Sequence, residues 1–184
     1  MYPQQIYATF FRRLGAGVLD FLLNAAVTLG IGWIASQSKL IAYLVLPPLW
    51  LASMLYEPFL HATFGATIGK FAVGIRVVSI RGEQIGWKAA LLRSSVSLAV
   101  TAYWVYCVST SIYSMPPDAF HGQGWGNLFQ LIKLNFPPAY ETAELALGLW
   151  FWSEFATMLL NSRRRAIHDF LAGTVVVRVK RGAA

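Results

Sequence analysis

Four long apolar stretches constrain this chain more than any other feature of its sequence. They cover about residues 14–35, 40–60, 90–112 and 143–160. A helix that spans a bilayer needs about 20 predominantly apolar residues, and the chain is 57% apolar and only 12% charged over its 184 residues. We therefore expect an all-α polytopic membrane protein with four transmembrane helices, built as a single domain over residues 1–184.

The basic residues follow the predicted helices unevenly. Thirteen of the 15 Lys and Arg residues precede the first stretch, lie between the second and third or at the start of the third, or follow the fourth; the other two are Lys39 and Lys133. Cytoplasmic loops of membrane proteins carry an excess of Lys and Arg. We therefore expect a multi-pass protein of the cell inner (plasma) membrane with both termini in the cytoplasm. The net charge of +7 then reflects the membrane surface, not nucleic acid.

Several local features qualify this helical pattern. Pro47-Pro48 removes backbone donors from the second stretch and should kink or break that helix. Residues 73–80 and 174–179 are rich in β-branched side chains and are expected to pair as a small cytoplasmic β-element. The outer loop, residues 114–142, is either a connector or a binding lid, and within it residues 127–134 fit a short amphipathic surface helix.

Ionisable residues inside the apolar stretches are costly in a bilayer and are candidate functional residues by default. Asp20, Glu57, Glu154 and Arg93 all fall at a similar shallow depth in the cytoplasmic half, and Asn24 lies one helical turn beyond Asp20. One interpretation is a proton or cation site formed by Asp20, Asn24, Glu57 and Glu154, with Arg93 neutralising one carboxylate. The other is a salt-bridge network that fixes helix packing, with side chains reaching the headgroups.

The sequence contains no recognisable motif for cofactor binding or catalysis. The run GATIGK at residues 65–70 has three residues between its glycines, where a phosphate-binding loop has four. Lys70 is therefore expected to reach a headgroup or a carboxylate. His61, His168 and Asp169 lack metal-ligand spacing, and no nucleophile or dinucleotide pattern is present. The sequence thus predicts no metal, no cofactor, no catalytic residues and no enzyme activity.

Three fragments in order resemble the RDD family of bacterial and archaeal membrane proteins. They are RRLGAGVLD at 12–20, TIGKFAVGIRVV at 67–78 and RRAIHDFLAGTVVV at 164–177. The resemblance equates Arg13, Asp20 and Asp169 with the arginine and the two aspartates that name the family, and it also covers Lys70. It implies fold and membrane location more firmly than activity, since the family is largely uncharacterised, with a proposed role in transport and some members similar to sodium/proton antiporters.

Two functions remain open at this stage. The first is transport of protons or monovalent cations such as Na⁺, with Asp20 as the ion site and Arg13, Arg93 and Asp169 as its charge partners. The alternative is a noncatalytic membrane scaffold or assembly partner of another membrane protein. The expected partners are the bilayer, anionic lipid headgroups near residues 163–165, and either a second copy of the chain or another membrane protein.

Overall fold

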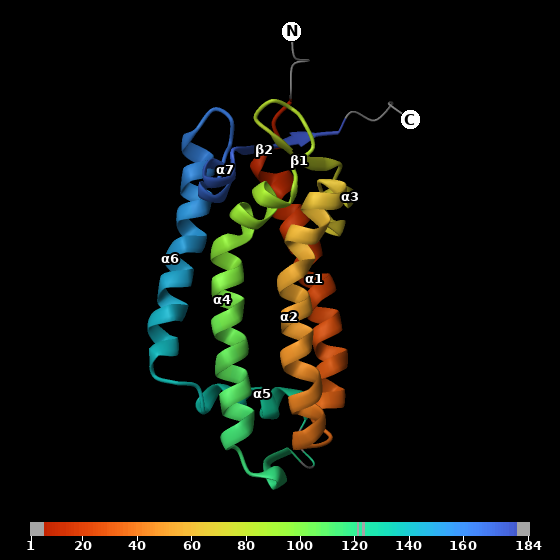
Figure 1. Ribbon diagram of the computed structural model, residues 1–184, viewed down its shortest axis with the longest axis vertical. Coiled ribbons are helices and arrows are strands. Elements are labelled where there is room, and N and C mark those ends of the chain that lie inside the picture. The colour runs from red at the N-terminus through yellow and green to blue at the C-terminus, as the bar shows by residue number, and fades with distance from the viewer. Residues whose placement is uncertain (1–5, 121, 123, 180–184) are drawn as a thin grey trace. The chain divides into compact units, whose positions relative to one another are not determined.

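The computed structural model describes residues 6–120, 122 and 124–179 (Figure 1). Lys180 and Arg181, which belong to the predicted cytoplasmic basic group, lie outside the described residues. The elements in chain order are α1 (Phe10–Ala35), α2 (Lys39–Phe64), α3 (Ile68–Ala72), β1 (Ile75–Ser79), α4 (Trp87–Ser114), the 3-10 helix η1 (Pro117–Phe120), α5 (Trp125–Leu134), α6 (Ala139–Leu160), α7 (Ile167–Ala172) and β2 (Thr174–Arg178).

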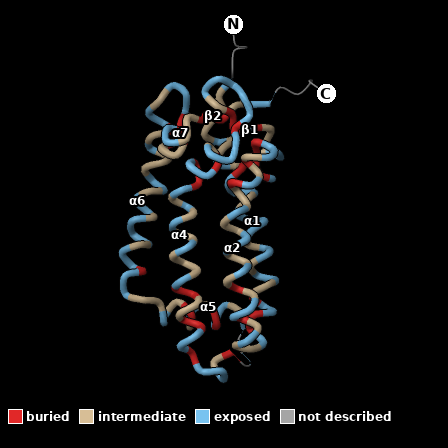
Figure 2. The backbone as a smooth tube through the Cα atoms, viewed as in Figure 1, coloured by how far each residue is buried: buried red, intermediate tan, exposed pale blue. Residues whose placement is uncertain are grey.

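Three helices in the described part of the chain, α1, α2 and α4, are long and apolar enough to cross a membrane. The fourth predicted stretch lies in α6, which has 22 residues but carries Glu141, Glu144 and Glu154 and is not among the three. The middle turns of the long helices contain few buried residues (Figure 2). Apolar side chains that remain exposed in this way are what a helix facing lipid requires.

Of the kink or break predicted at Pro47-Pro48, the break is wrong. The helix α2 is continuous from Lys39 to Phe64. Each proline removes one N–H donor, which affects only the carbonyls four residues earlier. The flanking turns keep their own hydrogen bonds, and lipid offers a non-helical backbone no partner in exchange. The helical conformation therefore continues through both prolines.

The chain forms two compact units, and each of the four long helices contributes to both. Unit 1 comprises residues 1–22, 56–96 and 148–184, and unit 2 comprises residues 23–55 and 97–147. Unit 1 thus collects the segments before α1, between α2 and α4, and after α6. All the candidate site residues except Asn24 belong to unit 1.

A two-stranded antiparallel sheet lies at the centre of unit 1. The strands β1 and β2 pair with Val77 opposite Val176, and their β-branched side chains favour this extended conformation. The segment before α1 lies along β2, because the Ala8 N–H donates to the Val176 carbonyl at 2.9 Å. The buried apolar residues around the sheet are Ala8, Ala16, Ile75, Val77, Ile85, Ala90 and Val176.

Unit 2 has a separate, apolar core. Its largest buried side chains are Leu46, Ile112, Phe120, Leu128 and Ile132. The predicted helix at 127–134 is present as α5, whose residues Leu128 and Ile132 enter this core. Ser111 Oγ also donates to the Ile132 carbonyl at 2.6 Å. The packing of α5 thus fixes the outer loop within unit 2.

Lys39 is expected to stabilise unit 2. Its Nζ donates to the carbonyls of Tyr113 at 2.8 Å and Met115 at 2.6 Å, where α4 ends and leaves carbonyls unpaired. Replacing Lys39 by Met removes both charged hydrogen bonds and should lower the free energy of unfolding by about 1–2 kcal/mol. Lys133→Met is the control, because its pair with Glu144 spans 3.7 Å between a partly exposed and an exposed side chain and contributes little. Equal thermal midpoints for the two variants would contradict this role.

Candidate functional site

The most buried charged group in the candidate site is the Asp169 carboxylate, which is fully buried in α7. Its Oδ2 accepts hydrogen bonds from Arg13 Nη1 at 2.8 Å and from the Ala166 N–H at 3.1 Å. Its Oδ1 accepts from Arg93 Nη1 and from Thr174 Oγ1, the latter at 3.0 Å. We call Arg13, Arg93, Asp169 and Thr174 the Asp169 cluster. Since each oxygen has two donors, the carboxylate is saturated.

Local sequence explains how Asp169 reaches this position. The helix α7 follows Ala166, and the bond from the Ala166 N–H to Asp169 closes its first turn in the manner of a capping box. The helix ends at Gly173, whose φ of 65° lies in the left-handed region that glycine tolerates best. Arg165 secures the turn into β2, because it donates to the carbonyls of Asp169 at 2.7 Å and Thr174 at 3.0 Å.

The arginines of the Asp169 cluster set its electrostatics. Burial alone would raise the pKa of Asp169, but the guanidinium groups of Arg93 and Arg13 hold it well below its usual value. In the described part of the chain, Nε and Nη2 of Arg13 and Nε of Arg93 are buried without a hydrogen-bond partner. Both arginines therefore depend on Asp169 to offset the cost of burying their charge.

Asp20 accepts a separate set of hydrogen bonds, which joins α1 to α2 and to the segment after α2. Its Oδ1 accepts from the Tyr56 hydroxyl at 3.0 Å and the Gly69 N–H at 2.8 Å, and its Oδ2 accepts from Thr67 Oγ1 at 2.6 Å. A Cβ at Gly69 would lie 2.2 Å from the Ala16 carbonyl oxygen. Only glycine at this position lets the backbone of α3 approach α1 closely enough to bind Asp20.

Glu57 and Lys70 form an ion pair apart from the contacts of Asp169 and Asp20. Glu57 Oε1 lies 3.4 Å from Lys70 Nζ and 3.7 Å from Nδ1 of the fully buried His61. Burial lowers the pKa of Lys70, against the opposing effect of Glu57. Neither ring nitrogen of His61 has a hydrogen-bond partner among the described residues. Lys70 thus reaches a carboxylate, one of the two roles expected from the sequence.

Glu154 and His168 connect α6 to α7. Glu154 Oε2 lies 2.8 Å from His168 Nδ1, and its Oε1 accepts from the His168 N–H at 3.2 Å. Arg93 pairs with Asp169. The sequence had predicted that Arg93 would instead neutralise Asp20, Glu57 or Glu154. Asn24 lies one turn beyond Asp20 on α1 with an exposed side chain, in unit 2. The acids thus divide among separate partners.

Comparison with known proteins agrees with these motifs. The RDD family model matches residues 7–173. This chain belongs to the RDD family. No curated protein and no solved structure matches it. Arg13 and Asp169, which the sequence resemblance equates with the arginine and the second aspartate of the family name, are in direct contact, whereas Asp20 contacts a different segment.

Several partners of the RDD residues were not predicted from the sequence. They are Tyr56, Thr67, Arg165, His168 and Thr174. A signal was available for Thr67, because a threonine directly before a short helix is a preferred N-cap, and its hydroxyl accepts from the Lys70 N–H at 3.3 Å. The others follow only from tertiary contacts.

His168 should make this RDD chain sensitive to mild acid. Burial, reinforced by the Arg93 cation, lowers the pKa of His168, although Glu154 and Asp169 oppose this shift. A histidine whose folded pKa is depressed contributes stability that is complete above the unfolded pKa of about 6.5 and is lost as pH falls toward the folded pKa. We expect wild-type protein to lose more thermal stability than His168→Gln between about pH 7 and pH 5. Parallel losses in both proteins would exclude His168 as the group responsible.

Proposed function

We propose that this RDD-family chain is a noncatalytic scaffold or assembly partner in the cell inner membrane, with four spanning helices and both termini in the cytoplasm. The observation that carries the proposal is the saturation of Asp169, which ties together side chains from α1, α4 and the α7–β2 segment. A carboxylate with four donors is suited to holding segments in place. It has little capacity left to bind a transported ion.

Contacts within unit 1 support the four-helix topology. The segments before α1, between α2 and α4, and after α6 meet at the sheet, where Tyr7 bridges Val177 and β1 pairs with β2. These three segments must then lie on one side of the membrane. Since α4 crosses after β1, α6 has to cross back before β2. Its 22 residues span about 33 Å at about 1.5 Å per residue, enough for the hydrocarbon core.

The distribution of charge favours a scaffold over an ion carrier. Glu57 and Asp169 each lie within ion-pair distance of a Lys or Arg side chain, and Glu154 lies 2.8 Å from the His168 ring. Among the described residues of unit 2, the buried polar side chains are Ser36 and Ser111, and neither carries a charge. A charge is costly in the bilayer centre, and the described core of unit 2 offers an ion no charged side chain.

Purification from native membranes in a mild detergent tests the scaffold proposal. We expect one membrane protein, or a second copy of this chain, to copurify at a constant molar ratio across gentle detergents and salt concentrations. Chemical crosslinking before solubilisation should give the same pair. A folded chain that purifies alone and forms no crosslinked species in its native membrane would contradict the proposal.

Replacing Asp20 by Asn should loosen the contact between α1 and α3. The amide replaces one carboxylate oxygen by an NH₂ donor, which then faces either the Thr67 hydroxyl or the donors of Tyr56 and Gly69. We expect the free energy of unfolding to fall by about 1–3 kcal/mol, with reduced accumulation in membranes. Thermal unfolding in detergent measures the change, and Asp118→Asn, at an exposed residue of η1, is the matched control. An Asp20→Asn protein as stable as the control would contradict a structural role.

Transport of protons or monovalent cations is the second candidate function. It is favoured by one observation: Glu57 is 39% exposed in its side chain and lies beside the buried, unpartnered ring of His61. If Glu57 and His61 carried protons, cation-dependent flux in liposomes would be lost in Glu57→Gln. It would be retained in Glu83→Gln, which alters an exposed loop carboxylate. Equal flux in the two variants would exclude Glu57 as the carrier.

A further inference from the structure

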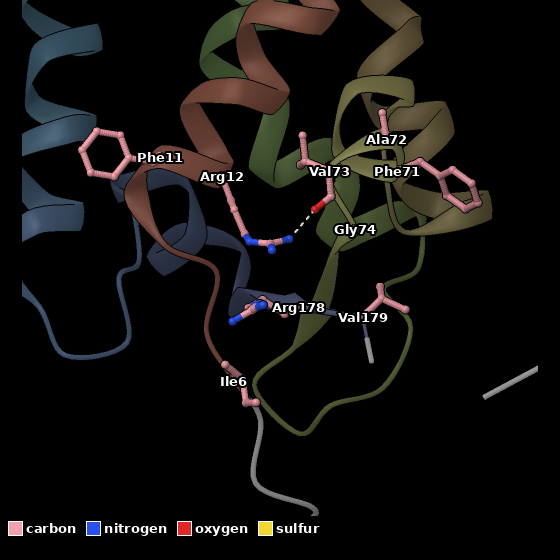
Figure 3. Close-up of a pocket in the computed structure, with 9 residues that line it drawn as sticks. All are labelled: Ile6, Phe11, Arg12, Phe71, Ala72, Val73, Gly74, Arg178 and Val179. Carbon is pink, nitrogen blue, oxygen red and sulfur yellow. Dashed lines mark hydrogen bonds between the residues drawn. The ribbon is translucent and has the colours of Figure 1, made fainter. Parts of the chain in front are cut away.

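A groove of about 850 Å³ opens in unit 1 where three segments meet (Figure 3). Its lining comes from Ile6 and the first turn of α1, from residues 71–74 at the end of α3 and in the turn before β1, and from Arg178 and Val179 at the end of β2. Ligand sites in proteins commonly have volumes of about 300–1,000 Å³. The groove is therefore large enough to hold a headgroup, and none of the proposed scaffold contacts occupies it.

Two guanidinium groups give the groove its charge. Arg12 and Arg178 both line it, and no carboxylate is among the lining residues. Arg12 is held in place because its Nη1 donates to the Val73 carbonyl at 2.6 Å. Arg178 is anchored by its backbone, whose N–H donates to the Ile6 carbonyl at 2.8 Å, while the residue itself is exposed. The groove thus carries two cationic side chains, one of them held by a hydrogen bond, and favours an anion.

Apolar side chains flank these cations. Phe11 is 79% exposed and Phe71 is 80% exposed, and Figure 3 shows Arg12 and Arg178 in the view between the two rings. Exposed aromatic rings next to arginines at the start of a spanning helix are typical of the membrane interface. The apolar rings match the upper acyl chains of a lipid, and the cations match its phosphate.

We infer that this groove binds an anionic phospholipid, with Arg12 and Arg178 on the headgroup phosphate and Phe11 and Phe71 against the glycerol and upper acyl region. Guanidinium groups suit this role because their planar donors match phosphate oxygens in pairs. The site is distinct from the basic run at residues 163–165. It also differs from the Asp169 cluster, whose arginines are committed to a carboxylate.

Native mass spectrometry of the full chain tests this inference. The protein is released from nanodiscs that contain equal amounts of phosphatidylglycerol and phosphatidylcholine, and the lipids that remain bound are counted. We expect one retained phosphatidylglycerol in wild type. Arg178→Gln removes one basic contact near the membrane surface and should weaken retention of phosphatidylglycerol about fivefold. Arg81→Gln, which alters an exposed arginine outside the groove, should retain the lipid as wild type does.

Two further arms separate the alternatives. Phe71→Ser, which keeps both cations, should also reduce retention, because a lipid uses the apolar wall and free phosphate does not. Inorganic phosphate at millimolar concentration should not displace the lipid. The inference is overturned if Arg178→Gln and Arg81→Gln retain phosphatidylglycerol equally, if phosphatidylcholine is held as well as phosphatidylglycerol, or if phosphate alone competes fully.

Discussion

Replacing Asp169 by Asn is expected to lower the free energy of unfolding by about 3–5 kcal/mol, because it leaves two buried guanidinium groups without their counterion. Arg13 and Arg93 are 11% and 4% exposed in their side chains, so water cannot replace the lost carboxylate. The asparagine NH₂ would also face donors. In addition, the first turn of α7 loses the negative group that accepts from the Ala166 N–H.

The intrinsic fluorescence of the tryptophans during heating in detergent measures this loss, and size-exclusion chromatography reports the folded fraction. Asp118→Asn is the control, because it makes the same chemical change at an exposed residue in η1. We expect the control to unfold as wild type does and Asp169→Asn to unfold much earlier or to fail to accumulate. Similar unfolding midpoints in the two variants would show that the Asp169 cluster does not hold unit 1 together.

Replacing Gly69 by Ala is expected to cost about 3 kcal/mol, from overpacking and from weakening the hydrogen bond to Asp20. The new Cβ would lie 2.2 Å from the Ala16 carbonyl oxygen and 2.9 Å from the Asp20 carboxylate. The nearest atom belongs to the backbone of a long helix, which cannot move aside as a flexible side chain can. The segment after α2 must therefore withdraw from α1.

Gly17→Ala is the matched control for this prediction. Gly17 lies in α1, next to Ala16, and a Cβ there meets nothing within 4 Å. Alanine is also the better helix former by about 1 kcal/mol. We expect Gly17→Ala to be neutral or slightly more stable and Gly69→Ala to show faster proteolysis of residues 65–74 together with a lower unfolding midpoint. Identical digestion patterns for the two variants would contradict the close approach.

The positions of the long helices could be predicted from the sequence, but the first residues of three of them could not. The predicted stretches began at about residues 14, 90 and 143, whereas α1, α4 and α6 begin at Phe10, Trp87 and Ala139. Hydropathy identifies the length that fits the lipid, and the helical hydrogen bonds continue into the polar flanks. The sequence also favoured a break at Pro47-Pro48 that does not occur, because lipid favours the helix over any irregular backbone.

The charged residues of the candidate site could be proposed from the sequence, whereas their contacts and polar partners such as Thr67 and Thr174 could not. Costly charges in apolar stretches indicated Asp20, Glu57 and Arg93, and the RDD resemblance indicated Arg13 and Asp169. The ion pair between Arg13 and Asp169 joins residues 156 positions apart, and no local periodicity encodes such a distance. Their contact depends on how the sheet of unit 1 brings the two ends of the chain together.

Proton flux in proteoliposomes tests the central claim, that the charged residues of unit 1 hold the protein together and do not carry ions. Purified wild-type protein and Asp20→Asn are reconstituted with a trapped pH dye, and sodium, potassium or lithium is added outside under an imposed proton gradient. We predict that wild-type vesicles show the same flux as protein-free vesicles with each cation. Cation-dependent flux in wild type that disappears in folded Asp20→Asn protein would contradict the claim and make Asp20 the ion site.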